Sequence, residues 1–145
     1  MTPRDLSTAT VIERLMLMRR MLDVLDQVGE LAVCDVEVDL VRTAAAERAV
    51  AQLVDLASDI NAHVVATMAG MLPSDARSSF TQAAAIGVIT PELAEAISPS
   101  VGLRNILVHE YGTLDRERFV AALPMAREQF TSYIEQVGSW IAGRS

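Results

Sequence analysis

The sequence predicts an all-α protein built as an antiparallel helical bundle. Apolar residues recur at three- and four-residue steps over long stretches, which is the spacing of one face of an α-helix. The 145 residues include only 7 glycines and 5 prolines, fewer than many short strands and tight turns would need. The joins between the long helical stretches are short, which favours antiparallel neighbours. We expect residues 1–145 to form one domain, because domains usually contain about 100–200 residues.

The first half of the sequence predicts two long helices. Ser7 or Thr8 is positioned to cap the first helix, and its apolar pattern fades near Gly29. The second helix is expected over about residues 39–69 and would end near Gly70. Its apolar stripe has a spacing close to that of a coiled coil and consists of Ala46, Ala49, Leu53, Leu56, Ile60, Val64 and Met68.

The second half predicts shorter helices. They are expected over residues 76–86, 91–97, 101–111 and, after Asp115, in two further segments that reach about Ile141. Prolines set two of the breaks, because proline lacks the backbone N–H that a helix interior uses. Ser98-Pro99-Ser100 is expected to interrupt the helical pattern between residues 97 and 101, and Pro124 to separate the last two segments.

Charge and cysteine content limit the class of protein. Twelve basic residues, all arginine, face 19 acidic ones, for a net charge of −7. This balance argues against a broad, non-specific nucleic-acid binder, but it is compatible with a small arginine-lined pocket that binds one phosphate.

Cys34 is the single cysteine, so no internal disulfide can form. No apolar run reaches about 18 residues and no signal-peptide core is recognisable, so we expect a cytoplasmic protein without a membrane span.

The chain has two histidines, and the first lies in the second long helix. His63 follows Asp59 by one helical turn and has Asn61 beside it. An Asp–His pair at this spacing can orient an imidazole or bind a metal. The simpler interpretation is a polar helix residue whose neighbour satisfies it. No other histidine or cysteine stands at ligand spacing, so a zinc site is not expected.

The second histidine lies among several functional side chains. His109 belongs to a stretch that also contains Arg104, Asn105 and Tyr111. At 100° per residue, Arg104 and Tyr111 fall on one helix face, and Asn105 and His109 share the neighbouring face. Ile106-Leu107 would turn towards the core. One exposed surface can therefore present a fixed cation, an amide, an imidazole and a phenol.

This stretch resembles the signature of a known family. Arg104-x4-His109-x-Tyr111 is similar to the R-x4-H-x-Y motif of the HepT toxins (DUF86 proteins), a branch of the HEPN superfamily. The similarity continues through the segments 102–105 and 108–112 and to Asp115. The second helix, around Arg42, Glu47-Arg48 and the Asp59–His63 region, also resembles that of the family. Helix order and chain length fit from end to end. The resemblance implies a helical bundle of HEPN type.

The resemblance also implies a chemistry. HEPN ribonucleases of this family are metal-independent homodimers, with the R-x4-H elements of two protomers facing each other and no cofactor. His109 would act as general base or acid towards an RNA substrate (tRNA or mRNA), and its copy in the partner would take the complementary role. Arg104 would bind the scissile phosphate. Asn105 would orient His109 or donate a hydrogen bond to the phosphate.

Tyr111 needs a separate explanation, because a phenol with a pKa of about 10 is a poor acid or base at neutral pH. The resemblance implies that this tyrosine is adenylylated by a cognate nucleotidyltransferase antitoxin of the MntA type. An AMP group beside Arg104 would block the site by charge and volume. Packing of Tyr111 in a dimer interface is a second, compatible interpretation.

Two alternatives to the enzyme remain open at the level of sequence. One is a non-catalytic HEPN-fold scaffold that binds a nucleotidyltransferase partner, and the other is a small structural four-helix protein without a ligand. Among the other side chains, Arg42, Arg48 and Arg77 either line an RNA path or are ordinary solvated helix charges. Trp140 and the methionines of the first helix (Met16, Met18 and Met21) are expected in the core or in an interface.

Overall fold

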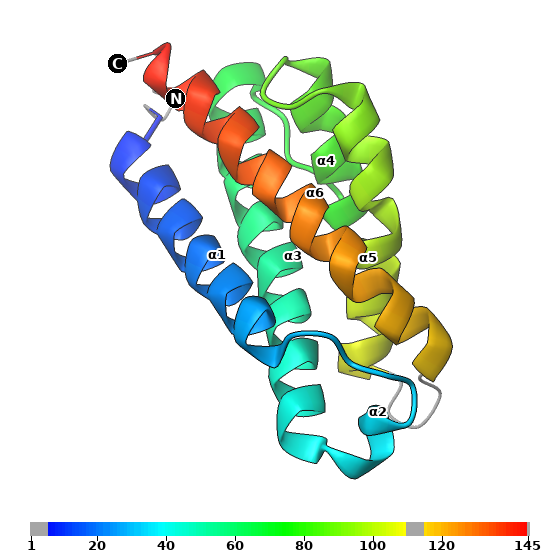
Figure 1. Ribbon diagram of the computed structural model, residues 1–145. Helices are drawn as coiled ribbons and strands as arrows, with labels where there is room; N and C mark the ends of the chain where they lie inside the picture. Colours follow the sequence, from blue (N-terminus) through cyan, green and yellow to red (C-terminus); the bar gives the residue numbers. More distant parts are fainter. Residues whose placement is uncertain (1–5, 110–114, 145) are drawn as a thin grey trace.

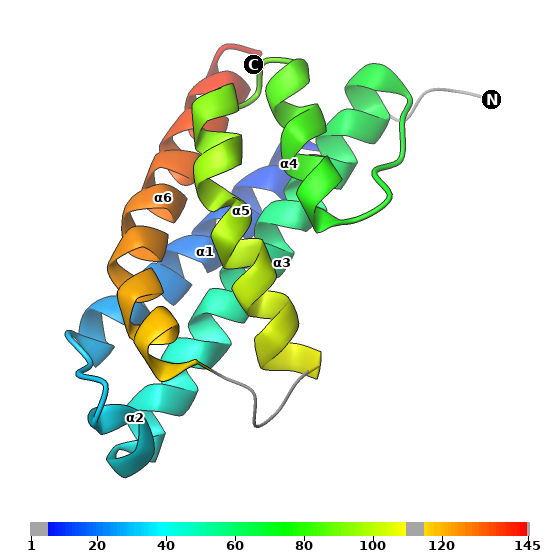
Figure 2. The same ribbon diagram turned by 90° about the vertical axis from the view of Figure 1, so that its right-hand side faces the viewer.

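The computed structural model of the protein describes residues 6–109 and 115–144 and consists of helices. They are α1 (Thr8–Val28), α2 (Asp35–Val38), α3 (Leu40–Ala69), α4 (Ala76–Ala85), α5 (Pro91–His109) and α6 (Arg116–Ala142). The four long helices run alternately in opposite directions along the bundle (Figure 1). The short α4 lies beside the C-terminal half of α3 (Figure 2). The predicted all-α antiparallel bundle is confirmed.

The two long N-terminal helices begin and end close to the predicted residues. The Ser7 side chain caps α1, and the Asp39 side chain caps α3. Gly29 ends α1 with φ of 68°, and Gly70 ends α3 with φ of 65°. Such positive φ values cost little only for glycine, which explains why the helices stop there.

Both prolines that were expected to break helices lie inside continuous ones, so these two predictions are wrong. Pro99 lies within α5 and Pro124 within α6. Each proline is on the exposed face of its helix, so the carbonyl group that loses its N–H partner can bind water instead. Buried side chains flank both prolines and hold the helix on either side, among them Ile97 and Val101 in α5 and Leu123 and Ala126 in α6.

Two further details differ from the expectation. The short helix α2 lies in the join between α1 and α3, where no helix was predicted, because four residues are too few for a periodic pattern. Met68, the last member of the predicted α3 stripe, is exposed. It lies in the last turn of α3, two residues before Gly70. The other members of the stripe are buried or partly buried.

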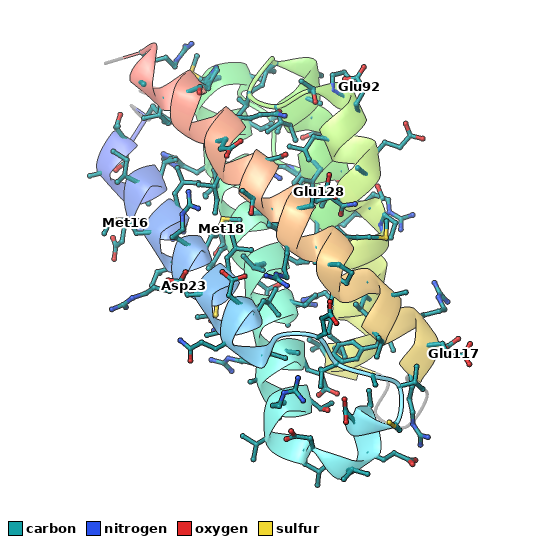
Figure 3. The ribbon with its side chains drawn as sticks, viewed as in Figure 1. Met16, Met18, Asp23, Glu92, Glu117 and Glu128 are labelled. Atoms are coloured by element: carbon teal, nitrogen blue, oxygen red, sulfur yellow. The ribbon has the colours of Figure 1, made fainter. Side chains whose placement is uncertain are left out.

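The core is built around α3, which packs against all five other helices. The methionines of α1 divide between core and surface: Met18 is 0% exposed and Met16 is 65% exposed (Figure 3). Trp140 in α6 is partly buried and packs against the core, with the Arg144 guanidinium 4.4 Å from its ring centre.

Within residues 6–109 and 115–144, no helix has the length and apolar character needed to cross a bilayer.

A buried polar network joins three helices in this core. The Tyr133 hydroxyl of α6 lies 2.6 Å from Oδ1 of Asn61 and 3.1 Å from the carbonyl oxygen of Ala57, both in α3. Asn61 Nδ2 donates to Oγ of Ser79 in α4 at 3.2 Å, and Ser79 Oγ donates to the Ala76 carbonyl at 2.6 Å. Burial raises the pKa of Tyr133 well above its usual value. The network thus fixes how α4 and α6 sit against α3.

Replacing Tyr133 by phenylalanine is expected to lower the free energy of unfolding by about 1–3 kcal/mol, because Oδ1 of Asn61 loses its buried donor. The raised pKa of Tyr133 adds a pH signature. The stabilisation linked to this raised pKa is fully present below pH ~10, the pKa of tyrosine in the unfolded chain, and is lost as the pH rises further. Urea denaturation as a function of pH should therefore show a steeper alkaline loss in wild type than in Tyr133→Phe.

Thr131→Val is the matched control for this change. Its hydroxyl donates to the Arg127 carbonyl one turn earlier in the same helix, so its loss should alter stability by less than about 0.5 kcal/mol. Equal effects of the two substitutions would contradict a special role for the Tyr133 network.

Candidate functional site

The C-terminal half of α5 carries the first two residues of the predicted site. Val101 and Leu103 are buried and Leu107 packs partly against the core, which fixes the rotation of the helix. Arg104 is consequently half-buried on the side facing α3, and Asn105 is exposed next to it. The sequence prediction that this segment is an amphipathic helix with polar groups at its surface is confirmed as far as Asn105.

Arg104 is held by a carboxylate from another helix. Its Nε donates to Oδ1 of Asp55 at 2.8 Å, and its Nη2 donates to Oδ2 of the same residue at 3.3 Å. Asp55 lies in α3 and is 49 residues away in the chain. The side chains are 25% and 51% exposed, respectively. This two-point contact fixes the plane of the guanidinium in a way that a single hydrogen bond cannot.

The contact with Asp55 leaves part of the guanidinium available. An arginine has five N–H donors, and Asp55 takes one from Nε and one from Nη2. Nη1 lies 3.5 Å from Oδ1 of Asn105, at the limit of a hydrogen bond. The outer edge, formed by Nη1 and the second Nη2 hydrogen, can therefore still bind a second anion in a bidentate manner.

Arg104 and Asn105 open onto a groove between α3, α4 and α5. The groove has a volume of about 750 Å³, within the range of known small-molecule pockets. Its lining combines acidic, basic and small residues: Asp55, Ser58, Asp59, Asp75, Ala76, Arg77, Val101, Arg104 and Asn105. The groove is polar and mixed in charge, which suits a ligand with anionic and hydrogen-bonding groups.

The remaining two predicted site residues fall at the edge of the described structure. His109 is the last residue of α5, one helical turn beyond Asn105, and its side chain lies outside the description. Tyr111 lies outside the described residues altogether. The predicted roles of both residues therefore stay predictions.

The other histidine has a different partner from the one its sequence neighbours suggest. Nε2 of His63 accepts a hydrogen bond from the backbone N–H of Ser7 at 3.0 Å. Oδ2 of Asp59 instead lies 3.9 Å from Nε of Arg14 in α1. His63 thus ties the start of α1 to α3, which agrees with the interpretation of a satisfied polar helix residue, although the satisfying group comes from another segment.

Two of the three other arginines considered from sequence have partners that account for them. Arg42 donates from Nε and Nη2 to the Val28 carbonyl at 2.9 and 2.6 Å, and from Nη2 to the Glu30 carbonyl at 2.8 Å. It therefore satisfies carbonyl groups at and beyond the end of α1. Arg48 lies within hydrogen-bonding distance of the Gln52 side chain, one turn on. The third, Arg77, lines the groove.

Asp55 is the site residue that sequence reasoning missed. Its position in α3 gives no local signal, because its relation to Arg104 arises only when α3 and α5 pack together.

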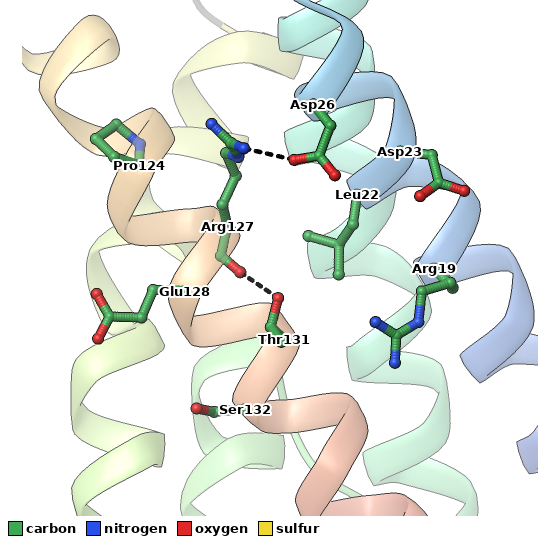
Figure 4. A pocket seen from close by; sticks show the side chains of 9 residues that line it. All are labelled: Arg19, Leu22, Asp23, Asp26, Pro124, Arg127, Glu128, Thr131 and Ser132. Atoms are coloured by element: carbon green, nitrogen blue, oxygen red, sulfur yellow. Dashed lines mark hydrogen bonds and ion pairs between the residues drawn. The ribbon is translucent and has the colours of Figure 1, made fainter. Parts of the chain in front are cut away.

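Another arginine–aspartate pair joins two long helices at a second groove (Figure 4). Nη2 of Arg127 in α6 donates to Oδ1 of Asp26 in α1 at 2.5 Å. That groove contains none of the predicted site residues.

Comparison with known proteins places the chain in a family. The model of the family described as "Ribonuclease HepT-like" matches residues 18–137, most of the chain. The chain belongs to the HepT-like ribonuclease family. The tRNA nuclease HepT of Aphanizomenon flos-aquae is 31% identical over 128 residues, which cover 88% of this chain and 87% of that protein. The match to the mRNA nuclease HepT of Shewanella oneidensis is 33% identical over 79 residues, or 54% of this chain and 59% of that one.

Solved structures give the same fold. The HEPN toxin of Shewanella oneidensis, solved in its tri-AMPylated form in complex with an MNT antitoxin, superposes with a TM-score of 0.80. The superposition covers 90% of this chain and 97% of the toxin, at 24% identity. The HEPN type of bundle expected from the sequence is therefore confirmed.

Proposed function

We propose that this HepT-like chain is a metal-independent endoribonuclease, the toxin of a toxin–antitoxin pair in the cytoplasm. The observation that carries the proposal is Arg104, an arginine of the family signature that Asp55 holds with one edge of its guanidinium still available for a phosphate. The membership of the chain in a ribonuclease family supports it, as do relatives named as a tRNA nuclease and an mRNA nuclease.

In the proposed reaction the RNA supplies its own nucleophile. A general base removes the proton of a ribose 2′-hydroxyl, and the 2′-oxygen attacks the neighbouring phosphorus. The bond from phosphorus to the 5′-oxygen breaks, and a general acid gives this oxygen a proton. Arg104 binds the phosphate and stabilises the charge that develops on it. The products are a 2′,3′-cyclic phosphate and a free 5′-hydroxyl, and water and metal take no part in the cleavage step.

The two proton transfers account for the proposed homodimer. The signature supplies one histidine per chain, His109, whereas the reaction needs a base and an acid at the same time. A two-fold axis apposes the same surface of both protomers and so brings a second copy of His109 to one site. An imidazole titrates near pH ~6.5, which suits both roles. Asn105, exposed beside Arg104, would orient His109 or donate to the phosphate.

The chemistry of the RNA ends tests this mechanism. An RNA cut by the purified protein should carry 5′-hydroxyl ends that polynucleotide kinase labels directly, and cyclic phosphates that acid opens to a mixture of 2′- and 3′-phosphates. Mass spectrometry of a short oligonucleotide distinguishes these products. Fragments with 5′-phosphates and 3′-hydroxyls would contradict the mechanism, because they require an attacking water.

Regulation at Tyr111 completes the proposal. The partner would be a nucleotidyltransferase antitoxin of the MntA type, which transfers AMP from ATP to the phenol oxygen of Tyr111 and releases pyrophosphate. The tri-AMPylated Shewanella toxin in complex with an MNT antitoxin supports AMP transfer by such a partner. The added phosphate and nucleoside would occupy the space beside Arg104 that the RNA phosphate needs.

Tyr111→Phe is expected to abolish neutralisation while keeping cleavage. After incubation with the antitoxin and ATP, wild type should gain one or more AMP units in intact mass and lose cleavage. The variant should gain none at this position and stay active. An antitoxin that silences Tyr111→Phe as fully as wild type would show that neutralisation acts by another route.

A further inference from the structure

The groove beside Arg104 contains a second arginine, Arg77, in the first turn of α4. Both arginines line the same groove, Arg104 from α5 and Arg77 from α4. They differ in their contacts. Arg104 is half-buried and paired with Asp55, whereas Arg77 is exposed. In the described parts of the chain, no carboxylate oxygen lies within 4.0 Å of the Arg77 guanidinium.

The acidic residues of the groove have closer partners than Arg77. Asp55 is bound to Arg104, and Asp59 faces Arg14 at 3.9 Å. Asp75 caps α4: its Oδ1 accepts from the backbone N–H of Ser78 at 2.7 Å, and its own N–H donates to Ser78 Oγ at 3.1 Å. Hydrogen bonds from Ser78, and to a smaller extent the charge of Arg77, lower the pKa of Asp75. The capping contacts hold the first turn of α4, and with it Arg77, at the groove.

We propose that Arg77 binds a second phosphate of the RNA, next to the scissile one, so that the groove holds the nucleotide between the two phosphates. This inference rests on the proposed ribonuclease function and adds to it a direction for the substrate strand, from α5 across the groove to α4. The carboxylates that line the groove keep further lone pairs, which can accept hydrogen bonds from ribose hydroxyl groups or base amino groups of that nucleotide. The arrangement reconciles an acidic protein with an RNA substrate, because cations are needed only at the two points where phosphates lie.

Salt dependence tests the proposed contact. Each phosphate contact on a single strand contributes a slope of about 0.7 to the fall of log affinity with log salt. Arg77→Gln should therefore reduce the slope for kcat/KM by about 0.7 and raise KM about fourfold at ~0.15 M salt, with kcat nearly unchanged. Arg19→Gln is the matched control, because Arg19 lines the other groove, between α1 and α6 (Figure 4). It should leave slope and KM as in wild type.

Neutral phosphate analogues identify the contact directly. A series of RNA oligonucleotides, each with a methylphosphonate at one linkage, removes one negative charge at a time. A methylphosphonate at one linkage next to the cleaved bond should weaken RNA binding to wild type about fourfold. The same substitution should not weaken binding to Arg77→Gln any further. Equal losses for both proteins at every linkage would overturn the proposal, as would an Arg77→Gln protein with the slope of wild type.

Two readouts separate this inference from the proposed function. Fluorescence anisotropy with a 2′-O-methyl RNA, which cannot be cleaved through a 2′-hydroxyl, measures the Arg77 contact even if wild type proves inactive as a nuclease. The molecular mass in solution detects the competing occupant of the groove, a second copy of the chain. A loss of dimer in Arg77→Gln at unchanged RNA slope would assign Arg77 to the subunit interface and overturn the proposal.

Discussion

Replacing His109 by alanine should lower the rate of RNA cleavage by about 10²–10⁴, because that is the usual contribution of a side chain that transfers a proton in the transition state. In the proposed dimer the substitution removes both the base and the acid, so the loss should lie at the upper end of this range. The measurement is the single-turnover rate on an RNA oligonucleotide at saturating protein.

The other histidine provides the control. His63→Gln changes the only other imidazole of the chain, in a residue that binds the Ser7 backbone and does not line the groove of Arg104. It should cleave at nearly the rate of wild type. If His63→Gln lost as much activity as His109→Ala at equal folded fraction, the assignment of the chemistry to His109 would be wrong.

The second large effect concerns the arginine and the carboxylate that holds it. Arg104→Gln should lower the cleavage rate by about 10²–10³, the usual result of removing a donor that stabilises transition-state charge. Asp55→Ala keeps that donor and removes only its support, so we expect a loss of about tenfold, mainly in kcat, because a misplaced group stabilises the transition state less well. The stability of Asp55→Ala should change by less than about 1 kcal/mol, since the pair is partly exposed.

Asp26→Ala is the matched control for Asp55→Ala. It breaks the hydrogen bond between Arg127 and Asp26, which also joins two long helices but lies in a groove without any of the predicted site residues (Figure 4). Cleavage by Asp26→Ala should equal that of wild type. Faster cleavage by Asp55→Ala than by wild type would contradict the positioning role, since it would mean that Asp55 competes with the RNA phosphate for Arg104.

Local signals in the sequence were sufficient for the long helices and for part of the site. Ser7, Asp39 and the glycines at positions 29 and 70 act through neighbouring backbone groups, so their effects can be recognised from a few consecutive residues. The same holds for the amphipathic pattern that carries Arg104 and Asn105 to the surface of α5. These features were predicted correctly because each depends on short-range geometry.

The features that were predicted wrongly or missed depend on packing. A proline rule that considers only the missing N–H expects breaks at Pro99 and Pro124, whereas the buried residues on either side of each proline keep the helix continuous. The Asp55–Arg104 pair joins residues 49 positions apart, and the groove that Arg77 shares with Arg104 exists only once α4 packs between its neighbours. No periodicity in the sequence encodes such contacts.

The most direct test of the proposed function is cleavage of total tRNA and mRNA by the purified protein in EDTA, with the intact mass of each sample measured beforehand. Wild type that carries no AMP should cut RNA in EDTA at the rate seen with added magnesium, and His109→Ala should cut at least about 10²-fold more slowly. Unmodified wild type that cuts nothing over a range of salt and pH, or that cuts only when a divalent metal is present, would contradict a metal-independent ribonuclease.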